Sequence, residues 1–253
     1  MLGIGLSLYK GAVTILTYIT DNLLQYFNMK NTSPELFLEG STSFDGVNDY
    51  VSLGATFNTT FDGAFTVSMW VNLIDGRPSS TESFLGSWNS SEEDILLFYV
   101  TQTTGKLAVY YEANNISAEA TTASAVFADG VTGWVHLAFT ISTSQINIYV
   151  DGVSQTLDGT NNGDMTANSV VMSNFSTNIN MVLGARDKNG TREEFLEGHM
   201  ANVGIWNRVL TQNDLFDVKF KNYADLSVSL ASGLISWYPL HTNANDSKST
   251  NNG

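Results

Sequence analysis

The sequence predicts an all-β protein built from antiparallel strands. Apolar and polar residues nearly alternate over residues 65–72 (FTVSMWVN), which is typical of a strand with one buried face and one solvated face. Similar short segments recur between residues 36 and 183, and clusters of Gly, Asn, Asp and Ser separate them rather than helical patterns. Strands at this spacing form an antiparallel sandwich or barrel.

The clearest hairpin joins residues 134–141 to residues 145–150 through a Ser-Thr-Ser turn. Both segments alternate apolar and polar residues in the same way as residues 65–72. In the strand at residues 65–72, the side chains expected to point into the core are Phe65, Val67, Met69 and Val71. Further strands are expected at residues 50–53, 83–88, 95–100, 106–111, 181–183 and 201–206.

One internal helix is expected at residues 211–222. Thr211 can cap its first turn, and Leu215 and Val218 fall on its inward face. Residues 158–180 are rich in Asn, Thr and Gly, and we expect them to form a long loop because such residues favour turns over regular strands.

Composition excludes several classes of function. The 253 residues include no cysteine, so a disulfide framework, a thiolate metal site and a thiol nucleophile are all excluded. The 25 acidic and 11 basic residues give a formal charge of −14 with no basic cluster, so we expect no nucleic-acid partner. Hydrophobic residues make up 43% of the chain, which is enough for a folded core.

The first 35 residues are more apolar than the remainder, and we expect them to form an arm outside a domain at residues 36–253. The uncharged stretch at residues 11–20 is about half as long as a bilayer-spanning helix, and no secretory cleavage site follows it. Apolar residues at steps of three and four favour a short helix whose anchoring face comprises Ile15, Leu16, Ile19, Leu23 and Phe27. We expect this face to dock on a neighbouring subunit; packing on its own domain is the alternative.

Six motifs follow one another in a recognisable order. They lie at residues 44–51 (FDGVNDYV), 65–71 (FTVSMWV), 134–139 (WVHLAF), 148–152 (IYVDG), 183–198 (from LGA to FLEG) and 201–210 (ANVGIWNRVL). In this order the chain resembles the laminin-G-like, concanavalin-A-like jelly rolls, a family that includes pentraxins and many bacterial and phage adhesion modules. The resemblance implies a two-sheet antiparallel jelly roll, to which the sequence adds an apolar N-terminal arm and one short helix. Residues 234–240 (LISWYPL) look like the strand and loop that often open such a domain.

The resemblance also directs attention to a catalytic motif that is missing. Glucan hydrolases of this fold carry Glu-x-Asp-x-x-Glu on one strand, with the two working carboxyl groups about 5 Å apart. The nearest partial match to this motif is Glu92-Glu93-Asp94. It lacks the last glutamate of the motif, and we expect it to be a solvated loop. No serine lies in a nucleophile-elbow context, and the histidines share no metal-ligand spacing. We therefore expect the chain not to be an enzyme.

Calcium is a cofactor that this architecture often carries. Asp45, Asn48 and Asp49 form a cluster of oxygen donors of the kind that calcium prefers. Many relatives have Asp-Glu where this chain has Ala201-Asn202, and the aspartate there looks like a ligand of the structural ion in related glucanases, so we expect that ion site to be lost or altered. The loop at Asp45 is therefore the candidate calcium site.

Candidate glycan-binding residues lie near strand ends and in loops. They are Trp88, Asn89, Asp187 and Asn189, with Tyr110-Tyr111 as a further position that a ligand could reach. Aromatic rings can stack on sugar faces, and amides and carboxylates can hydrogen-bond to hydroxyls. The alternative is that these side chains contact other proteins.

Taken together, these features predict a non-enzymatic structural or adhesion protein of a virion, most simply a bacteriophage head decoration, fibre or tail appendage. Its arm would contact other virion proteins within a homo-oligomeric assembly, and its jelly roll would face outward and bind host-surface glycans. The alternative is a secreted or cell-surface module that binds carbohydrate through calcium.

Overall fold

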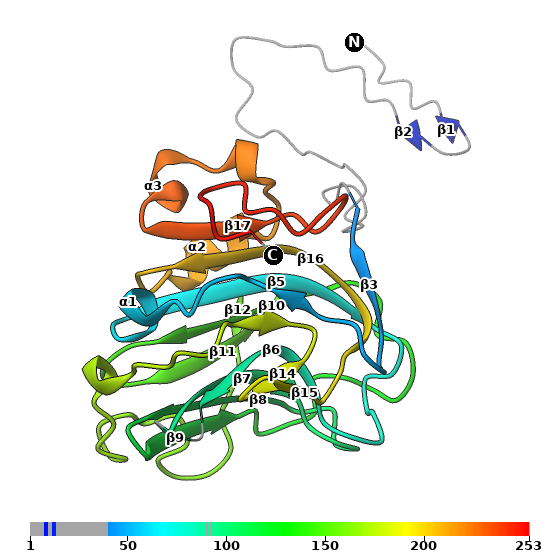
Figure 1. The fold of residues 1–253 in the computed structure, drawn as a ribbon. Helices are drawn as coiled ribbons and strands as arrows, with labels where there is room; N and C mark the ends of the chain where they lie inside the picture. The colour runs from blue at the N-terminus through cyan, green and yellow to red at the C-terminus, as the bar shows by residue number, and fades with distance from the viewer. Residues whose placement is uncertain (1–7, 10–11, 14–39, 90, 92, 253) are drawn as a thin grey trace, which may run out of the picture.

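The computed structural model describes residues 8–9, 12–13, 40–89, 91 and 93–252. Two large sheets stack face to face as a jelly-roll sandwich (Figure 1), which confirms the predicted fold class. The first sheet has seven strands in the order β12-β11-β10-β5-β16-β17, with β3 paired to β16. The second has eight strands in the order β15-β14-β6-β7-β8-β9, with β13 paired to β6 and to β4.

The seven-stranded sheet comprises β3 (Thr42–Asp45), β5 (Phe65–Leu73), β10 (Val135–Ile141), β11 (Ile146–Val150), β12 (Val153–Ser154), β16 (Glu197–Trp206) and β17 (Leu234–Tyr238). The eight-stranded sheet comprises β4 (Val51–Ser52), β6 (Glu82–Asn89), β7 (Asp94–Val100), β8 (Leu107–Ala113), β9 (Ile116–Thr121), β13 (Val182–Leu183), β14 (Arg186–Lys188) and β15 (Thr191–Glu193). Each strand predicted above overlaps one of these, whereas β3, β9, β12, β14 and β15 had no strand predicted for them.

The core lies between the two sheets, and aromatic rings connect them. Phe65, Val67, Met69 and Val71 are fully buried there, as predicted from their alternation. On the seven-stranded sheet, the ring of Phe139 lies 5.8 Å from that of Phe65, edge to face. The same ring lies 5.1 Å from Phe98 on the opposite sheet. These contacts join β5, β10 and β7 into one packed unit.

The outer face of the seven-stranded sheet is also buried, so the expectation of a solvated face on β5 is wrong. Residues after β16 turn back over this face and form a second apolar cluster, which includes Trp206, Leu215, Leu230 and Trp237. Trp206 and Trp237 meet edge to face at 6.1 Å, and Trp206 Nε1 donates to the carbonyl of Leu230. A covering layer of this kind adds apolar burial that the alternation within one strand cannot reveal.

The predicted helix is present as α2 (Gln212–Val218), four residues shorter at its C-terminal end than expected. Thr211 and Asp214 form a reciprocal capping box, as the expected role of Thr211 implied. Two further helices, α1 (Asn58–Phe61) and α3 (Val228–Ala231), and the 3₁₀ turns η2 (Met172–Asn174) and η3 (Tyr223–Asp225) were not predicted. Each has only one turn, which is too short to show a helical period.

Near the N-terminus, the structure describes a small hairpin of β1 (Leu8–Tyr9) and β2 (Ala12–Val13). The expected anchoring residues Ile15, Leu16, Ile19, Leu23 and Phe27 lie outside the described residues, so the arm and its boundary at residue 35 stay predictions. Among the helices that the structure describes, none has the length and apolar character needed to cross a bilayer.

His136 on β10 lies on the buried outer face of the seven-stranded sheet. Its side chain is 2% exposed, packs edge to face on Trp70 at 5.4 Å, and has no hydrogen-bond partner for Nδ1 among the described residues. Trp70 Nε1 donates to the carbonyl of Lys219, which follows α2. Burial, assisted by the positive charge of Lys219, lowers the pKa of His136 to about 3.

Replacing Phe139 with alanine should lower the free energy of unfolding by about 3 to 5 kcal/mol, because it removes the ring that contacts both sheets. Urea denaturation measures this change. Val153→Ala, at a position 54% exposed, is the control and should stay within about 0.5 kcal/mol of the parent. A loss below about 1 kcal/mol for Phe139→Ala would contradict this description of the core.

The buried, neutral His136 should make the protein less stable in acid. The unfolded chain binds a proton at this residue near pH 6.5, whereas the folded chain does so only near pH 3. The protonation of His136 therefore does not lower the free energy of unfolding above pH 6.5, and it lowers this free energy progressively as the pH drops toward 3. Thermal melts from pH 7 to pH 4 should show a smaller decline for His136→Phe than for the parent. Equal declines would show that His136 is not the responsible group.

Candidate functional site

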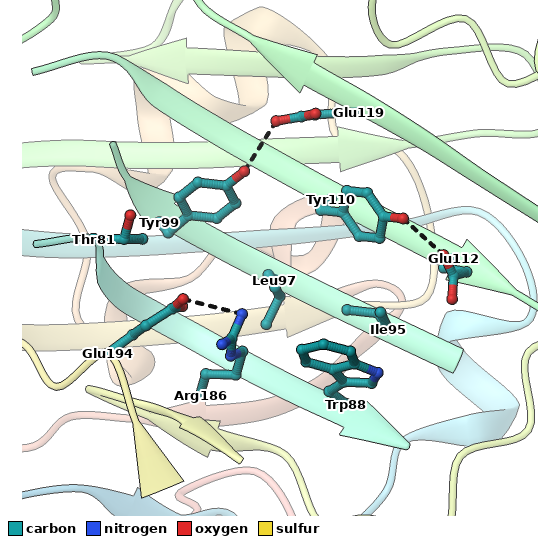
Figure 2. A pocket seen from close by; sticks show the side chains of 10 residues that line it. All are labelled: Thr81, Trp88, Ile95, Leu97, Tyr99, Tyr110, Glu112, Glu119, Arg186 and Glu194. Carbon is teal, nitrogen blue, oxygen red and sulfur yellow. Dashed lines mark hydrogen bonds and ion pairs between the residues drawn. The ribbon is translucent and has the colours of Figure 1, made fainter. Parts of the chain in front are cut away.

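A groove of about 470 Å³ lies on the outer face of the eight-stranded sheet (Figure 2). This volume lies within the usual range for small-molecule sites. The groove is lined by Thr81, Trp88, Ile95, Leu97, Tyr99, Tyr110, Glu112, Glu119, Arg186 and Glu194. These residues come from β6, β7, β8, β9 and β14 and from the segments before β6 and after β15.

Strict alternation along β7 divides its side chains between the core and the groove. Leu96, Phe98 and Val100 belong to the core, whereas Ile95, Leu97 and Tyr99 face the groove. Although Ile95 and Leu97 point away from the core, each is only 6% exposed. Their cross-strand neighbours explain this burial: Trp88 is opposite Ile95, and Tyr110 is opposite Leu97. The groove therefore has an apolar floor with aromatic walls.

Both tyrosines of the groove are fixed by carboxylates. Tyr99 Oη donates to Glu119 Oε1 at 2.9 Å, and Tyr110 Oη donates to Glu112 Oε2 at 2.7 Å (Figure 2). Burial, followed by the nearby carboxylates, raises the pKa of Tyr99. Burial also raises that of Tyr110, with Glu112 adding to it. The two hydroxyls therefore stay protonated, and the carboxylates keep further lone pairs for a ligand's hydroxyl groups.

Arg186 on β14 closes the other side of the groove. Its Nη2 lies 2.7 Å from Glu193 Oε1, and its Nη1 lies 3.0 Å from Glu194 Oε1. Its guanidinium carbon is 4.9 Å from the centre of the Trp88 ring, and Lys188 Nζ is 3.9 Å from the same ring. Burial raises the pKa of Glu194, and the charge of Arg186 opposes that rise.

A second hollow of about 440 Å³ lies next to the groove. It shares Thr81, Arg186 and Glu194 with the groove, so the two hollows adjoin. Its other lining residues are Gly46, Ser80, Gln102, Glu193 and Phe195.

Of the four candidate glycan residues, Trp88 lines the groove, and the other three lie beside it on β6, on β14 and in the turn after β14. Parallel pairing of β14 with β6 brings the four together. Asp187 is 2% exposed, accepts from Gly190 N at 2.6 Å and pairs with Arg192 at 3.1 Å. Asn89 is 1% exposed and donates to Asn178 Oδ1. Asn189 occupies the two-residue turn between β14 and β15 at a φ of 53°.

The sequence did not indicate most of the polar groups of the groove. Tyr110 was suggested, and it lines the groove, while its neighbour Tyr111 is buried in the core. Glu119 lies far from Arg186 and Glu194 in the chain, and no catalytic or binding motif marks any of the three. The only local signal was the alternation itself, which places Tyr110 and Glu112 on the same face of β8.

The candidate calcium loop is organised by its own backbone. Asp45 Oδ1 accepts hydrogen bonds from the backbone N–H groups of Val47 and Asn48, and Asp49 Oδ2 accepts from Asp45 N. The bonds from Val47 and Asn48 lower the pKa of Asp45. Within the described part of the chain, no group of three His, Cys, Asp or Glu side chains could hold a metal ion. Calcium at Asp45, Asn48 and Asp49 stays a prediction.

The acidic triplet before β7 is only partly the solvated loop that was expected. Glu92 lies outside the described residues, and Glu93 is exposed at a left-handed φ of 57°. Asp94, in contrast, is 1% exposed, so the solvated interpretation is wrong for it. Its two carboxylate oxygens accept from Asn114 N and Ser176 N, each at 2.9 Å. Asp94 therefore fastens two neighbouring segments to the start of β7.

The chain matches the model of a known protein family. The model of the concanavalin A-like lectin/glucanases superfamily matches residues 45–216. No curated protein matches the chain significantly.

Several solved structures share the fold. The CBM40 module of the Ruminococcus gnavus IT-sialidase superposes with a TM-score of 0.55 at 12% identity, over 72% of this chain and 97% of that one. The same module bound to α2,6 sialyllactose gives 0.54 at 13% identity, over 72% and 97%. The NanB sialidase of Streptococcus pneumoniae gives 0.54 at 14% identity, over 70% of this chain and 27% of the sialidase. At these identities the likeness shows the fold alone.

Proposed function

Because the chain belongs to the concanavalin A-like lectin/glucanase superfamily, we propose that it is a glycan-binding protein whose ligand occupies the groove on the outer face of the eight-stranded sheet. One observation carries this proposal. Three aromatic side chains and three carboxylates converge on a single groove: five come from the consecutive strands β6 to β9, and Glu194 comes from the segment after β15. A sialidase module with the same fold has been observed with sialyllactose, which supports a sugar as the ligand class.

The groove offers a sugar two kinds of contact. The C–H faces of a pyranose can pack on Trp88, Tyr99 and Tyr110. Hydrogen bonds hold the two tyrosines, and the cations of Arg186 and Lys188 lie against the Trp88 ring. Its hydroxyl groups can donate to Glu112 and Glu119, whose remaining lone pairs accept only. Since the tyrosines are already fixed in the free protein, little side-chain freedom is lost on binding.

The proposed role is non-catalytic. Hydrolysis by this superfamily's carboxylate pair needs a motif that the sequence lacks, and Asp94 of the partial motif is committed to backbone donors. We expect no release of reducing ends from laminarin, agarose or any glycan that binds the groove. Turnover abolished by Glu112→Gln or Glu119→Gln would assign catalysis to the groove instead.

Attachment to a virion is the finer part of the proposal, and it rests on the apolar sequence of residues 1–35. In this form the arm docks on other particle proteins and the domain presents its groove to host-surface glycans. The location is then an extracellular particle. A secreted or cell-surface module that uses calcium at the Asp45 loop is the second form, and it needs no particle.

Trp88→Ala should weaken binding of the best glycan on a glycan array by about tenfold, because it removes one wall of the groove. Isothermal titration calorimetry measures the change. Tyr50→Ala is the matched control, since Tyr50 is a 43% exposed aromatic residue that does not line the groove. If Trp88→Ala is folded and binds as tightly as the parent, the ligand lies elsewhere.

Deleting residues 1–35 should leave a folded, soluble domain that binds glycans but no longer joins its particle. The comparison uses the melting temperature and incorporation of the full-length and truncated chains. A truncated chain that melts earlier, yet is still incorporated, would show that the arm packs on its own domain.

A further inference from the structure

We infer that the groove selects glycans by charge: it accepts neutral oligosaccharides, binds those that carry a free amino group more tightly, and rejects those with sialic acid, uronic acid or sulfate. This inference rests on the proposed function and names the ligand class for the same groove. It separates this chain from the sialidase module of similar fold, which is known with sialyllactose.

Acidic groups outnumber basic ones along the groove. The groove and the adjoining hollow are lined by Glu112, Glu119, Glu193 and Glu194, against one arginine, Arg186. The nearest further cation is Lys188, whose ammonium lies over the Trp88 ring. Within the described part of the chain, neither Glu112 nor Glu119 takes part in an ion pair. A concave wall concentrates the field of such unpaired charges, and the formal charge of −14 acts in the same direction.

The arginine is already committed to protein carboxylates. Both terminal nitrogens of Arg186 are paired, one with Glu193 and one with Glu194. Its Nε is buried and has no hydrogen-bond partner among the described residues. With Nε buried and a carboxylate against each terminal nitrogen, the protein itself already balances the charge of Arg186. A ligand carboxylate would have to compete with Glu193 and Glu194 for the same guanidinium.

The free acceptors of the groove favour donors on the ligand. An ionised carboxylate accepts hydrogen bonds and cannot donate them. Glu112 and Glu119 each receive one bond from a tyrosine and retain capacity for more. Sugar hydroxyls satisfy that capacity, and an ammonium group does so with an added charge attraction. A sialic acid, uronic acid or sulfate would bring a further anion against the same oxygens.

Matched glycans test the inference. Calorimetry or an array at pH 6 would compare lactose with its two sialyllactoses, and N-acetylated chitotetraose with its de-N-acetylated tetramer. We expect sialylation to weaken binding by about fivefold or more, and de-N-acetylation to strengthen it by a similar factor. The preference for the amine should shrink in 0.5 M NaCl, because salt screens exposed charges.

Charge-removing variants tie the preference to the groove. Glu112→Gln and Glu119→Gln keep the size of each side chain, and together they should bring the affinities for the amino and N-acetylated tetramers to within about twofold of each other. Asp217→Asn, an exposed change on α2 over the other sheet, is the control and should leave the ratio unchanged.

The possible failures are distinguishable. If no glycan binds on the array, the proposed function fails, and the charge inference fails with it. If neutral glycans bind but sialylated or sulfated forms bind equally or better, only the charge inference is overturned. The same conclusion follows if the preference for the amine survives the double variant, since its source would then lie outside the groove.

Discussion

The two-residue period of β7 is the constraint on which the rest of the structure depends. Because successive side chains point to opposite faces, one strand supplies both Phe98, which contacts the opposite sheet, and Leu97 and Tyr99, which face the groove. A slip of one residue in its pairing with β6 or β8 would exchange these two sets. The same register therefore determines both the packing of the core and the shape of the groove.

That register also explains which features could be predicted from the sequence. The alternation in β5 and the hairpin of β10 and β11 depend on neighbouring residues, and both were predicted correctly. The burial of the outer face of β5 was not, because it depends on residues 207–238, which lie more than a hundred positions after β5 and fold back over its sheet. Local patterns report a strand's own amphipathicity and carry no information about what covers it.

The candidate site was predictable to a similar extent. Trp88 and Tyr110 could be proposed as exposed aromatic residues, and both line the groove. Arg186 enters only because β14 runs parallel to β6, an exception among antiparallel pairs that alternation cannot indicate. Gly86 permits this approach: a Cβ there would lie 2.9 Å from the Cα of Arg186. Asp187 and Asn189, which were also expected as ligand contacts, lie at the turn between β14 and β15, and a role for them in binding stays a prediction.

The central claim is that the groove over β6, β7 and β8 binds the glycan, and a crystal structure of the complex tests it most directly. Crystals grown with the tightest glycan identified on an array should show sugar rings packed on Trp88 or Tyr110 and hydroxyl groups within hydrogen-bond distance of Glu112 or Glu119. A glycan bound at the Asp45 loop, with the groove containing only solvent, would contradict the account.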